Sequence, residues 1–116
     1  MIRASTTFGR RRKRKRPVAI EFSLAAEDDL LGIFLYGIQE HGLAQAERYK
    51  GQLEATFQTI SDNPKITRLR REITPPVRVY PARRHMIVYT ILEDGQTVYV
   101  LRVRHHSENW TEHPIE

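Results

Sequence analysis

The chain has 116 residues, a formal net charge of +5 and no cysteine. That length fits one domain with one modest core, and the lack of cysteine excludes disulfides and thiolate metal sites, which suits a reducing cytoplasm. No apolar run approaches the roughly 20 residues of a membrane-spanning helix, and no apolar segment follows the basic N-terminus as in a secretory signal. We therefore expect a cytoplasmic protein with no membrane partner.

Basic residues are concentrated at the N-terminus. Residues 1–16 hold eight Lys and Arg and no acid, whereas 17–116 hold 11 basic and 14 acidic residues. Within that body, 17–66 is acidic (three basic, eight acidic), 67–104 is basic (eight against three), and 105–116 has three acids and no Lys or Arg. We interpret 1–16 as a disordered tail, because its charges repel and it lacks hydrophobic periodicity. It is a solvated extension, a stretch upstream of the true start, or an arm for nucleic acid.

The first half of the body predicts one strand and two helices. Val18–Phe22 alternates in the manner of a strand. Ser23 then provides an N-cap, and apolar residues recur every three or four positions as far as Gly42, a favourable residue just after a helix. A second amphipathic stretch ends at Asn63-Pro64. Because the connection at Gly42 is so short, we expect an antiparallel helix hairpin.

The second half changes to the two-residue period of strands. The expected strands are Leu69–Ile73, Val77–Tyr80, His85–Leu92 and Thr97–His105, separated or ended by Pro75-Pro76, Pro81 and Glu93-Asp94-Gly95. Asp94-Gly95 favours a hairpin turn, which makes the last two strands antiparallel. The order of strand, antiparallel two-helix hairpin and antiparallel β-meander predicts a two-layer α+β domain over residues 17–110, followed by a C-terminal tail at 111–116.

Alternation along the last expected strand divides its side chains between two faces. We expect Tyr99, Leu101 and Val103 to pack on the helices, and Val98, Val100, Arg102 and Arg104 to lie on the other face, with His106 if the strand continues. Arg78 alternates with Val77 and Val79 in the same way. If the strand register allows, Arg78, Arg102 and Arg104 form a basic face that binds phosphates or acidic protein segments. Otherwise they are solvated strand arginines.

The sequence contains no motif for a metal, a nucleotide cofactor or acyl transfer. His105 and His106 are adjacent, so on a strand they point to opposite faces, and His41 and His113 lie in a helix end and a tail. There is no Gly-rich phosphate loop and no GxSxG motif, and no acid is placed to complete a site with Ser107. We expect neither a metal nor a cofactor.

Several of these segments together resemble the ParE/RelE toxin superfamily. Its two-helix half is similar to Ala26, Asp29-Leu30, Ile33 and Tyr36, then Gly42, Ala46, Tyr49 and Leu53, then Asn63-Pro64. Its ParE-side strands are similar to Pro76–Pro81, His85–Tyr89 and Val100–His105, and the last motif, continuing through His106-Ser107-Glu108-Asn109-Trp110, is the most specific. The likeness covers roughly residues 17–110, and the basic tail has no counterpart in the typical pattern.

The resemblance implies a cytoplasmic toxin that a cognate antitoxin neutralises, as a homodimer or a toxin–antitoxin hetero-oligomer. ParE-like members of the superfamily bind and poison DNA gyrase, whereas RelE-like members cut mRNA on the ribosome. Ribosome-dependent nucleases tend to be basic throughout the body, to follow RNA phosphates, whereas residues 17–116 carry more acidic than basic side chains. We therefore favour gyrase as the target, with an mRNA endoribonuclease as the alternative and a small basic binding module as a further one.

Candidate residues differ between these functions. A nuclease needs a base, an acid and cationic stabilisation of the phosphate, and the candidates are Arg78, Tyr89, Arg102 and His106. Candidates for binding the target are Arg78, Arg102, Arg104, His105 and His106. Candidates for binding the antitoxin are Leu31, Leu35, Arg78 and Arg102.

Leu31 and Leu35 lie four residues apart and off the main apolar stripe of the first helix. They either widen the buried face of that helix or form an exposed apolar patch for the antitoxin or a second toxin copy.

Overall fold

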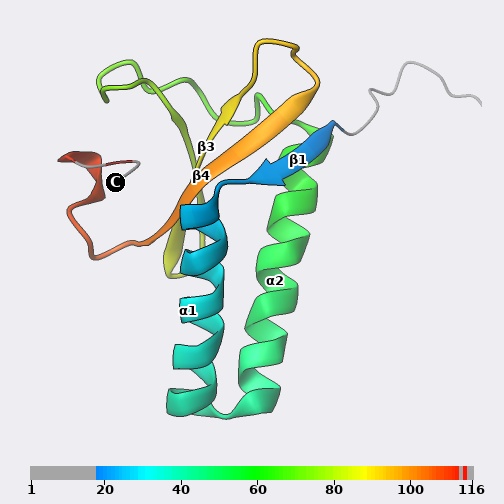
Figure 1. Ribbon diagram of the computed structural model, residues 1–116, viewed down its shortest axis with the longest axis vertical. Helices are drawn as coiled ribbons and strands as arrows, with labels where there is room; N and C mark the ends of the chain where they lie inside the picture. The colour runs from blue at the N-terminus through cyan, green and yellow to red at the C-terminus, as the bar shows by residue number, and fades with distance from the viewer. Residues whose placement is uncertain (1–17, 113, 115–116) are drawn as a thin grey trace, which may run out of the picture.

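The computed structural model describes residues 18–112 and 114, so the basic tail predicted at 1–16 and His113 lie outside the described residues. The elements in chain order are β1 (Ala19–Phe22), α1 (Leu24–His41), α2 (Leu43–Asp62), β2 (Arg78–Ala82), β3 (His85–Ile91), β4 (Thr97–His105) and a short 3-10 helix (Trp110–Glu112). Figure 1 shows the helix hairpin on one side of a twisted sheet and extending past its end. The predicted two-layer α+β fold is confirmed.

Both helices begin and end where the sequence predicts. Ser23 caps α1 by accepting a hydrogen bond from the Ala26 N–H at 2.9 Å. Gly42 separates the helices with a φ of 87°, a left-handed conformation that glycine adopts at little cost. The helices approach closely above this turn, because a Cβ built on Gly37 would lie 3.3 Å from the Cβ of Ala46. The short connection and this close approach fix the antiparallel hairpin.

The sheet has the strand order β1-β4-β3-β2. β2, β3 and β4 are antiparallel neighbours, whereas β1 runs parallel to β4 at its other edge. β1 pairs only with Thr97–Val100, so the second half of β4 extends beyond its neighbour. This half of β4 pairs with β3 on one side and lies beside the start of α1 on the other, which positions the first of the polar contacts described below.

A β-bulge changes the phase of side-chain alternation within β4. Tyr89 pairs with Val100 and Val88 pairs with Arg102, which leaves Leu101 as an extra residue. The helix-side core contains Val98, Val100 and Val103, whereas Leu101 packs on the opposite face. Our assignment of Val103 to the helices was correct. The assignments of Tyr99 and Leu101 to the helices, and of Val98 and Val100 to the opposite face, were wrong, because strict alternation fails at a bulge.

Two expectations about the middle of the chain were also wrong. Leu69–Ile73 forms no strand in the structure, apart from one isolated bridge between Arg70 and Val77. Pro81 does not end its strand but lies within β2. β2 is an edge strand, where a missing backbone N–H is tolerated.

A second, smaller core covers the sheet face opposite the helices. It contains Ile73, Val77, Val79, Val88 and Trp110, with Met86 and Leu101 packed against it. Trp110 is 7% exposed and begins the 3-10 helix, which crosses the predicted boundary at residue 110. The guanidinium of Arg70 lies 5.7 Å from the Trp110 ring, within range of a cation–π contact. No helix in the described part of the chain is long and apolar enough to cross a membrane.

Candidate functional site

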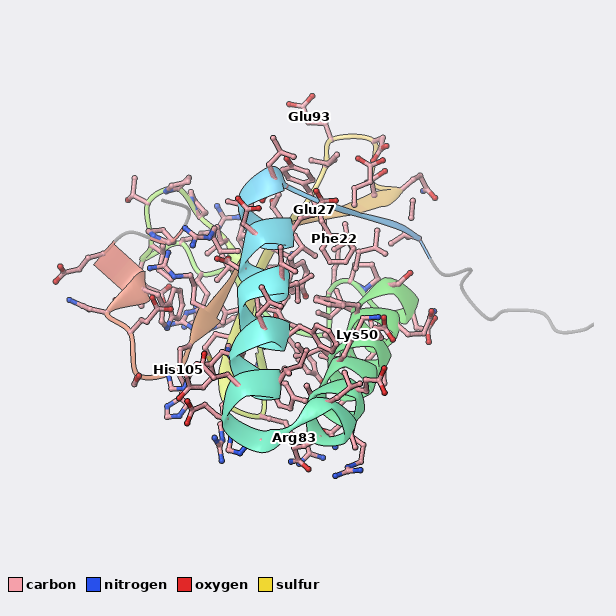
Figure 2. The ribbon with its side chains drawn as sticks, turned by 60° about the horizontal axis from the view of Figure 1, so that its bottom comes forward. Phe22, Glu27, Lys50, Arg83, Glu93 and His105 are labelled. Carbon is pink, nitrogen blue, oxygen red and sulfur yellow. The ribbon has the colours of Figure 1, made fainter. Side chains whose placement is uncertain are left out.

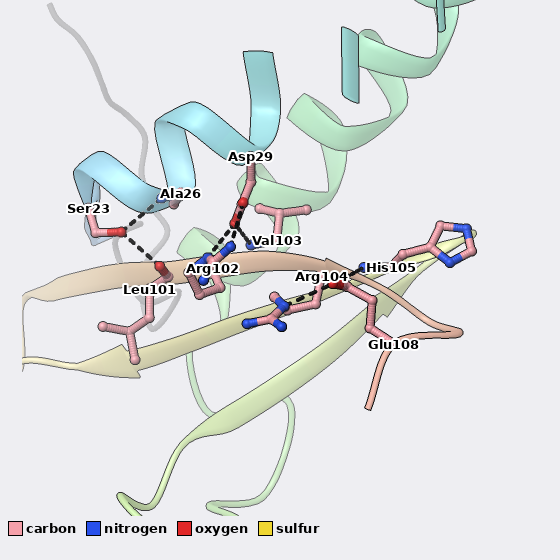
Figure 3. A network of polar contacts seen from close by, with 9 residues as sticks. All are labelled: Ser23, Ala26, Asp29, Leu101, Arg102, Val103, Arg104, His105 and Glu108. Carbon is pink, nitrogen blue, oxygen red and sulfur yellow. Dashed lines mark hydrogen bonds and ion pairs between the residues drawn. The ribbon is translucent and has the colours of Figure 1, made fainter. Parts of the chain in front are cut away.

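Arg102 is bound to α1 and does not lie on an open basic face. Its Nε and Nη2 donate to the two carboxylate oxygens of Asp29 at 2.7 and 2.8 Å, and the same carboxylate accepts the backbone N–H of Val103 at 2.9 Å (Figure 3). Both side chains are largely buried, at 17% and 15% exposure. These hydrogen bonds raise the pKa of Arg102, so the guanidinium stays charged.

Asp29 reaches this position because β1 is short. On its β1 side, β4 has no strand neighbour after Val100, and the start of α1 takes that place. The Ser23 N–H donates to the Val100 carbonyl at 2.9 Å, and the Ser23 hydroxyl donates to the Leu101 carbonyl at 2.7 Å. The N-terminal part of α1 therefore satisfies backbone groups of β4 that would otherwise lack partners.

Arg104 and His105 are tied to the segment that follows β4. The Glu108 carboxylate accepts the Arg104 Nε at 3.4 Å and the backbone N–H of His105 at 2.7 Å. Desolvation raises the pKa of Glu108, but these two hydrogen bonds and the charges of Arg104 and Arg102 together outweigh it, so the pKa is lowered. The turn after β4 is thus held by an ionised carboxylate.

Arg78 and Tyr89 lie at the far end of the sheet, against the loop after α2. The Tyr89 side chain is fully buried, and its hydroxyl donates to the Pro64 carbonyl at 2.7 Å and lies 3.2 Å from the Thr67 hydroxyl. Burial raises the Tyr89 pKa. The Arg78 guanidinium donates to the Thr67 carbonyl. Both side chains therefore fasten the loop to the sheet.

The single basic face that we expected from Arg78, Arg102 and Arg104 is not formed. Arg78 lies on the same sheet face as Tyr80 and Ala82, which pack against or belong to the helix-side core. Arg102 contacts α1, and Arg104 contacts the segment after β4. That expectation was wrong because the bulge at Leu101 changes the phase of β4. Likewise Arg78, Tyr89, Arg102 and His106, the nuclease candidates, are not brought together at one point.

The structure instead gathers histidines where β3 begins and β4 ends. His85 pairs with His105, and their rings meet edge to face with centroids 5.3 Å apart. The rings of His105 and His106 stack with centroids 4.6 Å apart. We expected these two to point to opposite faces, which was wrong, because β4 ends at His105 and His106 lies in the following turn. The described residues contain no group of ligands that could hold a metal ion.

Tyr49 connects this histidine end to α2. Its hydroxyl lies 2.7 Å from the His85 Nδ1 and 3.4 Å from the Ala82 carbonyl. Burial, together with the neighbouring His105, lowers the His85 pKa to about 4, so the imidazole is neutral at pH 7. Burial also raises the Tyr49 pKa, against the opposing effect of Arg84 and Arg83. The pair is therefore uncharged beside two permanent cations.

This end opens into a hollow of about 660 Å³ between the helix hairpin and the β2–β3 turn. Its walls include Leu31, Phe34 and Tyr36 of α1, Tyr49 and Lys50 of α2, and Arg83, Arg84, His85 and His105 from the strand ends. Figure 2 labels Lys50, Arg83 and His105 around this end of the molecule. Of the sequence candidates, Leu31 and His105 line the hollow. Tyr49, Arg83, Arg84 and His85 were missed as site residues, although the antiparallel register of the last two strands predicts that His85 and His105 meet.

Comparison with known proteins identifies the family. The profile for the ParE toxin of type II toxin–antitoxin systems, parDE, matches residues 20–110. The chain belongs to the ParE toxin family. Toxin ParE1 of Caulobacter vibrioides is 30% identical over 91 residues, which cover 78% of this chain and 92% of that protein.

Solved structures show the same fold for this ParE-family chain. A structure of the chromosomal ParDE toxin–antitoxin system from P. aeruginosa superposes with a TM-score of 0.65 at 14% identity, covering 76% of this chain and 95% of that one. The toxin–antitoxin complex RelBE2 from Mycobacterium tuberculosis superposes with a TM-score of 0.51 at 23% identity, covering 78% and 100%. The predicted resemblance to ParE/RelE toxins is confirmed.

The leucines that the sequence left ambiguous are exposed. Leu31 is 57% and Leu35 54% exposed on α1, and the adjacent Tyr36 is 63% exposed. They do not widen the buried face of the helix but form an exposed apolar pair on α1. A patch of this kind on a toxin surface is suited to contact with another protein.

Proposed function

We propose that this ParE-family chain is a toxin that binds and poisons DNA gyrase and is neutralised by a cognate antitoxin. The observation that carries the proposal is the family match over residues 20–110, supported by the relative named Toxin ParE1. Poisoning of this kind depends on a binding surface and requires no proton transfer by the toxin. The toxin leaves the chemistry of strand breakage to its target.

The placement of the nuclease candidates supports a binding role. RNA cleavage requires acid, base and cation within hydrogen-bond reach of one phosphate. The Tyr89 hydroxyl is buried and already donates to Pro64. Arg102 is engaged by Asp29, and His106 lies at the opposite end of β3 from Tyr89. These groups do not surround a common point.

The antitoxin is proposed on two grounds. The structural neighbours from P. aeruginosa and M. tuberculosis are described as toxin–antitoxin systems or complexes. In addition, α1 exposes Leu31 and Leu35, an apolar surface that a partner segment would cover. A segment that folds on contact would bury this surface. An acidic one would also complement the basic half of the sequence at 67–104, and its association would slow as salt increases.

The test measures gyrase inhibition and cleavage of ribosome-bound mRNA in parallel. Purified chain is added to gyrase with supercoiled DNA and, separately, to ribosomes carrying a defined message. We expect inhibition of supercoiling and DNA breaks that require gyrase, with the message left intact. A message cut in the absence of other nucleases, together with unaffected gyrase, would refute the gyrase proposal and establish an endoribonuclease.

A further inference from the structure

Side chains that carry hydrogen-bond donors line the polar end of the hollow. His105 lines the hollow, and its Nδ1 accepts the Ser107 N–H at 3.2 Å and lies 2.7 Å from the Ser107 hydroxyl. Because the main-chain N–H must donate, Nδ1 is the acceptor and the His105 ring carries a proton on Nε2. Nε2–H is therefore available as a donor.

Two arginines of the β2–β3 turn stand beside this donor. Arg83 and Arg84 both line the hollow and are exposed, and within the described residues neither forms an ion pair. Lys50, also in the wall, lies 3.6 Å from Glu54, so that charge is already balanced. Arg84 is fixed in place through its carbonyl, which accepts the His106 N–H at 2.8 Å. The hollow thus contains uncompensated positive charge on a fixed turn.

Aromatic side chains lie in the wall contributed by α1. Phe34 and Tyr36 line the hollow, and Tyr36 is 63% exposed. Cationic donors that bind phosphate, together with an exposed ring on which a base stacks, are the two parts of a nucleotide-binding surface. The volume of about 660 Å³ is within the usual range for small-ligand sites.

We propose that this hollow binds a nucleotide, with its phosphate on Arg84, Arg83 and the His105 Nε2 and its base against Tyr36. A planar guanidinium donates two parallel hydrogen bonds to phosphate oxygens, and the imidazole adds a third. The nucleotide is either free or part of a single strand, since both present the same phosphate and base. The proposal does not depend on gyrase being the target.

The test uses the full chain and backbone amide NMR spectra, so that binding by the basic tail is separated from binding in the hollow. The probes are inorganic phosphate, AMP and an eight-nucleotide single-stranded DNA. We expect all three to shift the amides of residues 83–85 and 105–107. Arg84→Gln should weaken the affinity for AMP, obtained from the titrated shifts, on the order of tenfold. That factor corresponds to the lower end of the free energy of a charge-assisted hydrogen bond. Arg71→Gln, an equal charge change on an exposed side chain beyond the other end of β2, should leave them unchanged.

A second variant tests the proposed contact between the nucleotide base and Tyr36. Tyr36→Ser should weaken AMP and oligonucleotide binding while leaving phosphate binding intact. Oligonucleotide binding at least tenfold tighter than AMP would identify a strand as the source of the nucleotide, and equal affinities would identify a free nucleotide. The proposal is wrong if saturating AMP and oligonucleotide leave residues 83–85 and 105–107 unmoved, or if Arg84→Gln and Arg71→Gln behave alike. It is also wrong if a hexaglutamate peptide shifts these amides and AMP does not.

Discussion

Asp29 on α1 and Arg102 on β4 form a bidentate ion pair between the helix hairpin and the sheet. The same carboxylate also accepts the Val103 N–H, on the edge of β4 that β1 no longer covers. One side chain therefore fixes the start of α1 and completes the edge of β4. The contact is largely buried, so solvent screens it less than a surface pair.

Replacing Asp29 by Ala should destabilise the fold by about 2–4 kcal/mol, because Arg102 would lose its charge partner and Val103 its acceptor. Chemical denaturation measures this loss. Asp28→Ala is the matched control, since that neighbouring carboxylate is exposed and its removal should change the free energy of unfolding by less than about 0.5 kcal/mol. Equal effects of the two substitutions would show that the ion pair contributes nothing specific.

The helical half of the fold was predictable because its signals are local. Ser23, Gly42 and Asn63-Pro64 each mark a helix end through the backbone conformation or hydrogen bond that the residue itself provides. The structure places α1 and α2 between those marks. A strand face, in contrast, depends on pairing with distant residues, and the extra residue Leu101 follows from the register with β3, which the sequence of β4 alone does not contain.

Stability should fall as the pH decreases from about 6.5 to 4, because of His85. The folded chain holds the His85 pKa near 4, whereas the unfolded chain has the ordinary value of 6.5. Between these values the unfolded state binds a proton that the folded state does not, so acid favours unfolding. Since His85 is only half-buried, we expect a contribution of about 1 kcal/mol after discounting for solvent screening.

His85→Gln isolates this effect. The free energy of unfolding of the variant, measured by denaturation at several pH values, should depend less on pH in that window than that of the native chain. Carboxylates with lowered pKa values, such as Asp94 and Glu108, act at lower pH and are common to both proteins. Parallel pH profiles for the two proteins would show that His85 titrates normally in the fold.

Tyr89→Phe should reduce stability without abolishing toxin activity. The substitution removes the buried hydroxyl that donates to Pro64, at a cost of about 1–2 kcal/mol. Tyr36→Phe is the control for stability, because the Tyr36 hydroxyl lies on an exposed side chain and its loss should be neutral. Activity on gyrase, scored per folded molecule, should be unchanged by Tyr89→Phe. A general acid would instead lose about 10²–10⁴-fold in rate, which would return Tyr89 to the list of catalytic candidates.

The histidine end was harder to predict than the fold, although its residues are conspicuous. Tyr49 belongs to the apolar stripe of α2, and a stripe position is ordinarily read as core. His85 and His105 are distant in sequence and meet only through the antiparallel pairing of β3 and β4. The contact between Tyr49 and His85 further requires the packing of α2 on that strand, which no single segment determines.

Leu31→Gln combined with Leu35→Gln should weaken antitoxin binding while leaving the fold intact. Both leucines are more than half exposed, so the double substitution should change the free energy of unfolding by no more than about 0.5 kcal/mol. If the antitoxin buries them, the loss of two apolar contacts should reduce its affinity by at least tenfold. Calorimetry with the cognate antitoxin measures that affinity. Leu24→Gln is the control, because Leu24 is 80% exposed at the opposite end of α1. Unchanged antitoxin affinity, with a native dimer that the double variant converts to monomer in sedimentation, would assign the patch to a second toxin copy instead.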